Sequence, residues 1–93
     1  MVNNPTISGL KLDHLIESLL FVAEGPVSIG QIAAALNTNP KQIKRALLKL
    51  EDLYQERGLQ LQNLRGRVQL TTNPKAAQSI EQFLGLESHL ELR

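Results

Sequence analysis

The chain has 93 residues, of which 42% are hydrophobic and 20% are charged, as is usual for one small globular domain. It contains no cysteine, which excludes disulfide frameworks and thiolate metal sites. Its formal net charge is +1, and no apolar run approaches the roughly 20 residues of a membrane helix. With no signal-peptide pattern at the start, we expect a cytoplasmic protein that does not contact a membrane.

The charge is unevenly distributed along the chain. Residues 41–75 hold eight basic and three acidic side chains, whereas residues 1–40 and 76–93 each hold one basic and three acidic side chains. Only 3% of the residues are aromatic, so the core must consist of leucine, isoleucine, valine and alanine. A core this small typically supplies only a few kcal/mol of net stability, which favours burial against a partner or a second copy.

The first predicted helix follows a flexible arm, residues 1–10, in which turn-forming residues dominate. The helix is expected over residues 11–24, where apolar residues from Leu12 to Ala23, including Val22, fall within one arc. A Gly-Pro pair ends it.

Two further helices with a short turn between them are predicted next. Ser28 and Gln31 form a capping box, which begins a helix that runs to about Leu36. Asn39 then caps a helix from Pro40 to about residue 57. The apolar stripe of that longer helix consists of Ile43, Ala46, Leu47, Leu50, Leu53 and Tyr54.

The period then changes from helical to alternating. Residues 59–62 and 68–71 alternate apolar with polar side chains on either side of a glycine-containing turn, which predicts a β-hairpin. A last helix is expected from Asn73 to Leu84, ended by Gly85. Its inward residues would be Ala76, Ile80, Phe83 and Leu84.

This order of elements predicts a mainly α winged helix-turn-helix fold: helix, helix-turn-helix, two-stranded wing and C-terminal helix. We expect the domain to span residues 11–85. The leucines of residues 86–93 carry no helix stop signal, so this tail is expected to be a linker or the start of an element that the chain does not include.

No pattern of catalytic or metal-binding residues occurs in the sequence. His14 and His89 are the only histidines, both have polar neighbours, and no second ligand stands at metal spacing. The acids form no paired arrangement suited to acid–base chemistry, and phosphate-binding glycine motifs do not occur. We therefore expect a binding module that is not an enzyme and uses no cofactor.

Basic side chains mark a candidate surface for DNA or phosphate. They are Lys41, Lys44, Arg45 and Lys49 on the third helix, Arg65 and Arg67 at the wing, and Lys75 before the last helix. Four bases precede the acids on the third helix, the reverse of what the helix dipole favours, so a function could maintain this order. The alternative is an ordinary solvated helix face. Gln42 alone interleaves the bases, so base-specific reading of DNA is weakly supported.

Two apolar residues lie away from the predicted core faces. Phe21 falls on the polar face of the first helix, and Leu48 falls on the solvent face of the third. Isolated exposed apolar residues are common, but a domain with few aromatic residues that places one off its core face is a candidate for protein contact. Packing of Phe21 under the wing or the arm is the alternative.

Two stretches resemble one known family. They are LIESLLFVAEGPVSIGQIAAAL (residues 15–36) and RGLQLQNLRGRVQLTTNPKAAQSIEQFLG (residues 57–85). The first is similar to the helix, G-x-P-[LVI]-S turn and second helix of segregation and condensation protein B (ScpB). The second is similar to the wing of that family, with its G-L-Q-L strand, glycine turn and L-x-T-x-P segment. The resemblance extends from about Leu12 to Leu84.

The resemblance implies two tandem winged-helix domains, a homodimer, and binding to a ScpA-like kleisin and through it to an SMC ATPase at the nucleoid. In the family, the first domain makes much of the dimer contact and the second is heavily involved in kleisin contacts. The resemblance implies that residues 86–93 begin the linker to an absent second domain. The resulting hypothesis is a non-catalytic adaptor in chromosome condensation and segregation, with weak non-specific DNA binding as a further property. The alternative hypothesis is a DNA-binding winged-helix transcription regulator.

Overall fold

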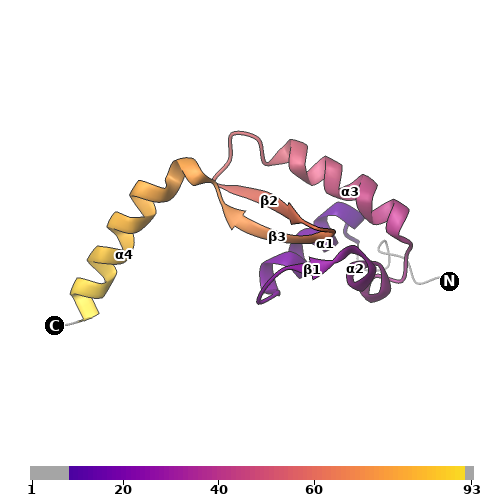
Figure 1. The fold of residues 1–93 in the computed structure, drawn as a ribbon, viewed down its shortest axis with the longest axis horizontal. Coiled ribbons are helices and arrows are strands. Elements are labelled where there is room, and N and C mark those ends of the chain that lie inside the picture. Colours follow the sequence, from indigo (N-terminus) through magenta and orange to yellow (C-terminus); the bar gives the residue numbers. More distant parts are fainter. Residues whose placement is uncertain (1–8, 92–93) are drawn as a thin grey trace.

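The computed structural model describes residues 9–91, and their side chains as far as residue 86. In chain order the elements are α1 (Leu12–Val22), β1 (Val27–Ser28), α2 (Ile29–Ala35), α3 (Pro40–Leu53), β2 (Leu59–Leu64), β3 (Arg67–Thr72), the 3₁₀ helix η2 (Pro74–Ala76) and α4 (Ala77–Glu91). α3 packs on α1 and α2, while α1 also packs on β3 (Figure 1). We call the part from α1 to β3 the body; it is a winged helix, as predicted.

The two predicted caps position the helix-turn-helix. The hydroxyl of Ser28 accepts a hydrogen bond from the backbone N–H of Gln31, whose side-chain oxygen accepts one from the backbone N–H of Ser28. Asn39 accepts a hydrogen bond from the backbone N–H of Gln42 at 2.9 Å, and Pro40 follows as the first residue of α3. Since these bonds satisfy N–H groups that have no partner inside the helix, both helices begin where the sequence predicts.

The sheet has three strands, where the sequence predicted a two-stranded wing. The strand order is β1-β3-β2, with Val27 opposite Val68. Two residues are too few to show an alternating pattern in the sequence. This strand forms only by pairing with a strand about 40 residues further along the chain. The wing strands are also longer than expected, since the turn between them is only Arg65-Gly66, with φ of 53° and 80°. Two left-handed residues are the mark of a tight hairpin turn.

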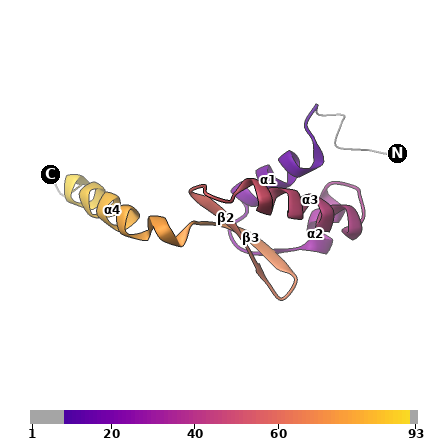
Figure 2. The ribbon, with the colours of Figure 1, turned by 90° about the horizontal axis from the view of Figure 1, so that it is seen from above.

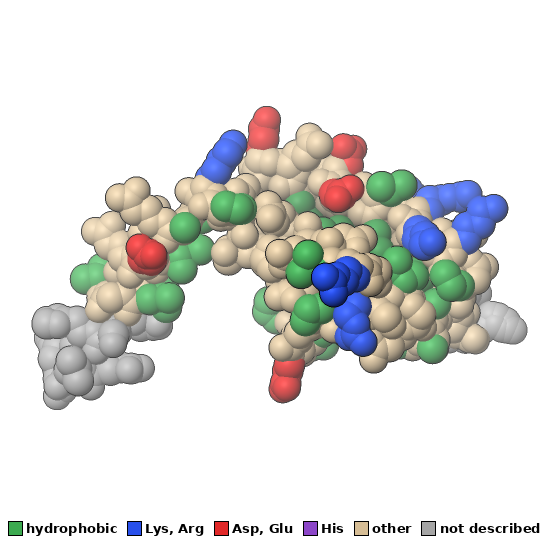
Figure 3. Space-filling model, in the orientation of Figure 1, with side chains coloured by type: hydrophobic (Ala, Val, Ile, Leu, Met, Phe, Trp, Pro, Cys, Tyr) green, Lys and Arg blue, Asp and Glu red, His purple; other side chains and the backbone are tan. Residues whose placement is uncertain are grey.

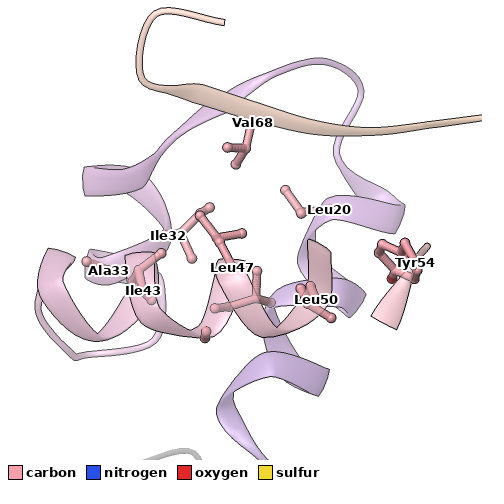
Figure 4. Close-up of a cluster of buried hydrophobic side chains, with 10 residues drawn as sticks. Leu20, Ile32, Ala33, Ile43, Leu47, Leu50, Tyr54 and Val68 are labelled. Carbon is pink, nitrogen blue, oxygen red and sulfur yellow. The ribbon is translucent and has the colours of Figure 1, made fainter. Parts of the chain in front are cut away.

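The core lies between the three helices of the body and the inner face of the sheet (Figure 4). Its buried hydrophobic side chains are Ile16, Leu20, Ile32, Ala33, Ile43, Ala46, Leu47, Leu50, Tyr54 and Val68. Two residues that the helical period placed on core faces are instead exposed: Val22 at 71% and Leu53 at 49%. Both lie in the last turn of their helix, where the body no longer covers the full width of the apolar arc.

α4 leads away from the body, as Figures 1 and 2 both show, and its main neighbour is η2. The prediction that Gly85 ends this helix is wrong, because the helix continues to Glu91. The prediction of an inward face is also wrong, since Phe83 is 59% and Leu84 is 52% exposed. That residues 86–93 begin a linker stays a prediction, and most of the proposed arm lies outside the described residues.

Candidate interaction surfaces

The four bases of α3 are all exposed, and three of them, Lys41, Lys44 and Arg45, lie in the N-terminal half of the helix. Figure 3 shows basic side chains gathered over that part of the molecule, with acidic side chains over the C-terminal part of α3. This matches the sequence order of the two charge signs. The structure thus presents Lys41, Lys44, Arg45 and Lys49 to solvent, as either candidate role would require.

The side of α3 that faces the wing is mixed in character. A hollow of about 260 Å³ lies between α3, the start of α2 and β2. Lys44 lines it together with Leu48, Glu51 and Leu61. In a DNA-binding winged helix this is where the recognition helix meets the nucleic acid, and an exposed leucine and a carboxylate there do not favour a phosphate backbone. The structure therefore brings Leu48 and Lys44 together on a surface suited to protein contact.

A larger groove, of about 770 Å³, follows α3 and β2 toward the C-terminal end of α3. Arg45 and Lys49 line it beside Asp52 and Glu56. Because its two bases are followed by acids toward the C-terminal end of α3, the groove has no single sign of charge that would attract a polyanion.

The two wing arginines lie at one end of β3, whereas Lys75 lies beyond the other end. Arg65 is in the hairpin turn, and Arg67 donates a hydrogen bond from Nη1 to the carbonyl oxygen of Pro26 at 3.3 Å, which ties the wing to the segment before β1. Lys75 is in η2, beyond the opposite end of β3. The seven candidate bases therefore do not form one continuous patch.

An apolar groove lies beside Phe21, which is 78% exposed. We call it the α1 groove; its volume is about 320 Å³ and its lining consists of Glu17, Ser18, Phe21, Val22, Leu59 and Leu70. Phe21 is thus packed neither into the core nor under the wing. The off-face position of this residue in the sequence correctly marked an exposed apolar site.

Sequence reasoning missed the other exposed members of this surface. The helical period places Val22 in the core arc, and Leu59 belongs to an ordinary alternating strand, yet Leu59 is 39% exposed at the groove. The sequence pattern also predicts a core position for the apolar stripe of α4, which is exposed. The only sign of these exposed apolar surfaces in the sequence is that Phe21 and Phe83, one on each surface, are two of the three aromatic residues.

One polar contact fixes the wall of the α1 groove. The hydroxyl of Tyr54 donates a hydrogen bond to a carboxylate oxygen of Glu17, joining the end of α3 to α1. Burial, followed by the hydrogen bond and negative charge of Glu17, raises the pKa of Tyr54 above its ordinary value of 10.0. Glu17 is therefore held in place at the groove edge.

Within residues 9–91, no group of three or more His, Cys, Asp or Glu residues is arranged to hold a metal ion. No helix in the same range is long and apolar enough to cross a membrane.

The fold and the exposed apolar surfaces define a winged-helix protein with surfaces suited to binding other proteins. The family model for the segregation and condensation complex subunit ScpB matches residues 14–93. This chain belongs to the ScpB family, as its sequence resemblance predicted.

Curated relatives carry the same description. Segregation and condensation protein B of Moorella thermoacetica is 41% identical over 71 residues, which are 74% of this chain and 36% of that protein. The protein of Syntrophotalea carbinolica is 36% identical over 76 residues, 80% of this chain and 39% of that protein. The chain thus spans less than half the length of these relatives.

Solved structures with the same fold include two of ScpB proteins. A dimer of the ScpB N-terminal domain complexed with a ScpA peptide superposes with a TM-score of 0.71 and 31% identity, covering 76% of this chain and 91% of that one. ScpB from Mycobacterium tuberculosis superposes with a TM-score of 0.78 and covers 83% of this chain and 49% of that one. At 23% identity the latter likeness concerns the fold alone.

Proposed function

We propose that this chain is the N-terminal winged-helix part of a non-catalytic adaptor in the bacterial SMC–kleisin complex. It acts in chromosome condensation and segregation, in the cytoplasm at the nucleoid, by forming a homodimer and binding a ScpA-like kleisin that links it to the SMC ATPase. The observation that carries the proposal is the 31% identity, over 76% of the chain, to a domain that forms a dimer and holds a ScpA peptide.

The surfaces of the chain support a role in protein contact. Phe21 and Leu48 are 78% and 66% exposed, and each lies at an apolar hollow. A small domain gains from covering such residues, because its own core contributes only a few kcal/mol.

Kleisin binding is tested with the kleisin of the same organism. The intact kleisin, and overlapping labelled peptides that cover it, are titrated with the chain and followed by fluorescence anisotropy. We expect at least one peptide to bind, and Leu48→Glu to weaken it more than the matched exposed control Gln78→Glu. If neither the kleisin nor any peptide binds at about 100 µM, the adaptor role of this domain is refuted.

DNA binding is the second candidate function, favoured by the four exposed bases of α3. We expect it to be weak and non-specific, because the seven bases are scattered and the wing-facing side of α3 carries Leu48 and Glu51. Sub-micromolar, sequence-selective binding would instead favour a transcription regulator.

A further inference from the structure

The apolar stripe of α4, which we define as Ile80, Phe83 and Leu84, has the spacing of one helix face. Phe83 and Leu84 are more than half exposed, and Leu86 beside them is 60% exposed. Leu86 lies at the edge of the stripe next to Phe83, and the opposite side of the helix, with the exposed Gln78, is polar. An amphipathic helix that stands away from its own domain requires another surface to cover its apolar face.

The α1 groove is an apolar surface of matching character. It lies next to the place where the chain leaves the body, because Leu59 pairs with Thr72, the last residue of β3. Figure 3 shows the molecule hollowed between α4 and the body, with hydrophobic side chains on α4. Each copy therefore carries both a helix with an uncovered apolar face and a groove with an uncovered apolar lining.

Asn73 sets the direction in which α4 leaves the body. Its backbone N–H donates to the carbonyl oxygen of Gly58 at 2.7 Å, and its side-chain amide donates to that of Arg57 at 2.9 Å. Its side-chain oxygen accepts from the backbone N–H of Lys75 at 2.9 Å. These hydrogen bonds hold the start of the segment that leads into α4 at the edge of the sheet, and in the structure α4 runs away from the groove of its own copy.

We propose that the α4 stripe of one copy docks in the α1 groove of a second copy, and that the α4 stripe of the second copy docks in the α1 groove of the first. This inference rests on the dimer of the proposed function and specifies its interface. It is an isologous arrangement, in which one twofold axis completes both contacts.

The exposed area is of the size that a stable dimer needs. Phe21 and Phe83 from two copies would together bury roughly 500 Å², given 150–250 Å² for a whole phenylalanine. Val22, Leu59, Leu84 and Leu86 add aliphatic surface at the same contacts. The sum reaches the range of specific interfaces, which begins at about 1,200 Å².

Cysteine cross-linking tests the contact, since the chain has no cysteine of its own. Val22→Cys and Leu84→Cys are made in separate chains, mixed and oxidised. We expect a disulfide between the two different chains and little within either preparation alone. Cross-linking of Val22→Cys with itself, or of Leu84→Cys with itself, in preference to the mixed pair would overturn the exchange.

A complementation experiment distinguishes exchange from contact between like surfaces. Phe83→Glu places a charge on the α4 stripe, and Phe21→Glu places a charge in the α1 groove. Each variant alone should therefore dimerise at least about tenfold more weakly than the wild type. A mixture retains one intact contact, between α4 of the Phe21→Glu chain and the groove of the Phe83→Glu chain, and should form a heterodimer. Gln78→Glu, on the side of α4 opposite the stripe, is the matched control and should dimerise normally.

The outcomes separate this inference from the proposed function. If both variants dimerise as the wild type does, the interface lies elsewhere, and the proposed dimer stands without this contact. If Phe83→Glu leaves the dimer intact but abolishes kleisin binding, the α4 stripe is a kleisin site and the exchange is wrong. A wild-type chain that is strictly monomeric removes the dimer itself.

Discussion

Tyr54 is the residue at which burial, hydrogen bonding and charge act together. Its hydroxyl donates to Glu17, so its pKa is raised above 10.0 in the folded chain. In the unfolded chain the tyrosine ionises near pH 10, while the folded chain keeps its proton to a higher pH. The unfolded state then binds fewer protons, so the stabilisation present below pH 10 is lost as the pH rises above that value.

The change Tyr54→Phe tests this contribution. At neutral pH we expect the free energy of unfolding to fall by about 1 kcal/mol, because one hydrogen bond to a carboxylate is lost. Above about pH 10 the difference between variant and wild type should shrink, since only the wild type loses stability by ionising this tyrosine. Urea unfolding across the alkaline range measures both effects; a difference that stays constant with pH would contradict the assignment.

Gly66 is the glycine whose conformation matters most to the wing. With φ of 80° in the hairpin turn, it occupies a region that costs other residues about 1–2 kcal/mol. We expect Gly66→Ala to lower the free energy of unfolding by that amount. Gly58→Ala is the control, since Gly58 lies outside the left-handed region and an added Cβ would meet open space. Equal effects of the two changes in urea unfolding would show that the turn conformation is not the cause.

At the scale of elements, α4 behaves as a helix beside the body rather than as part of its core. Gly85 lies in its interior, and an added Cβ would meet no atom within 4 Å. We expect Gly85→Ala to favour the helix by about 1 kcal/mol and Gly85→Pro to disfavour it by about 3 kcal/mol or more. Circular dichroism should show helix content rising in the first variant and falling in the second, with the melting temperature of the body nearly unchanged. A large shift of that temperature would place α4 in the cooperative core.

The basic part of α3 leads to a second prediction at this scale. If about 3–5 phosphates are neutralised, log K should fall with log salt with a slope of about −3 to −5, and the dissociation constant at physiological salt should be about 10⁻⁴ M or weaker. Replacing Lys44, Arg45 and Lys49 together with alanine should abolish binding to all DNA sequences alike. Absence of binding by the wild type at low salt would make this surface an ordinary solvated helix face.

At the scale of the whole molecule, the chain is extended, measuring 54 × 25 × 24 Å, and exposes two of its three aromatic side chains. We expect sedimentation at about 50 µM to show a dimer. Phe21→Ala should weaken the dimer while changing the melting temperature little, because Phe21 contributes almost nothing to the core.

Leu50→Ala provides the opposite pattern and serves as the control. Leu50 is fully buried, so its truncation should cost about 2–5 kcal/mol of folding stability. If Phe21→Ala lowered the melting temperature as strongly as Leu50→Ala does, Phe21 would belong to the core in solution.

Local signals in the sequence were sufficient for the order of the helices and the hairpin in the winged-helix body. Caps at Ser28 and Asn39 act within three residues of themselves, and the stripe from Ile43 to Leu50 needs only the helical period, so both could be predicted from neighbouring residues. The off-face position of Phe21 was also visible from periodicity, and it marked an exposed apolar site correctly.

The remaining features were decided by tertiary structure. β1 exists only through its pairing with β3, and the exposure of Val22 depends on where the body ends. The period of α4 predicts an apolar stripe but not what covers it, because a helical period gives the direction of a side chain relative to its own axis and not the position of that axis. The hydrogen bonds of Asn73, made to residues 15 and 16 positions earlier in the chain, direct α4 away from the body and leave its stripe uncovered.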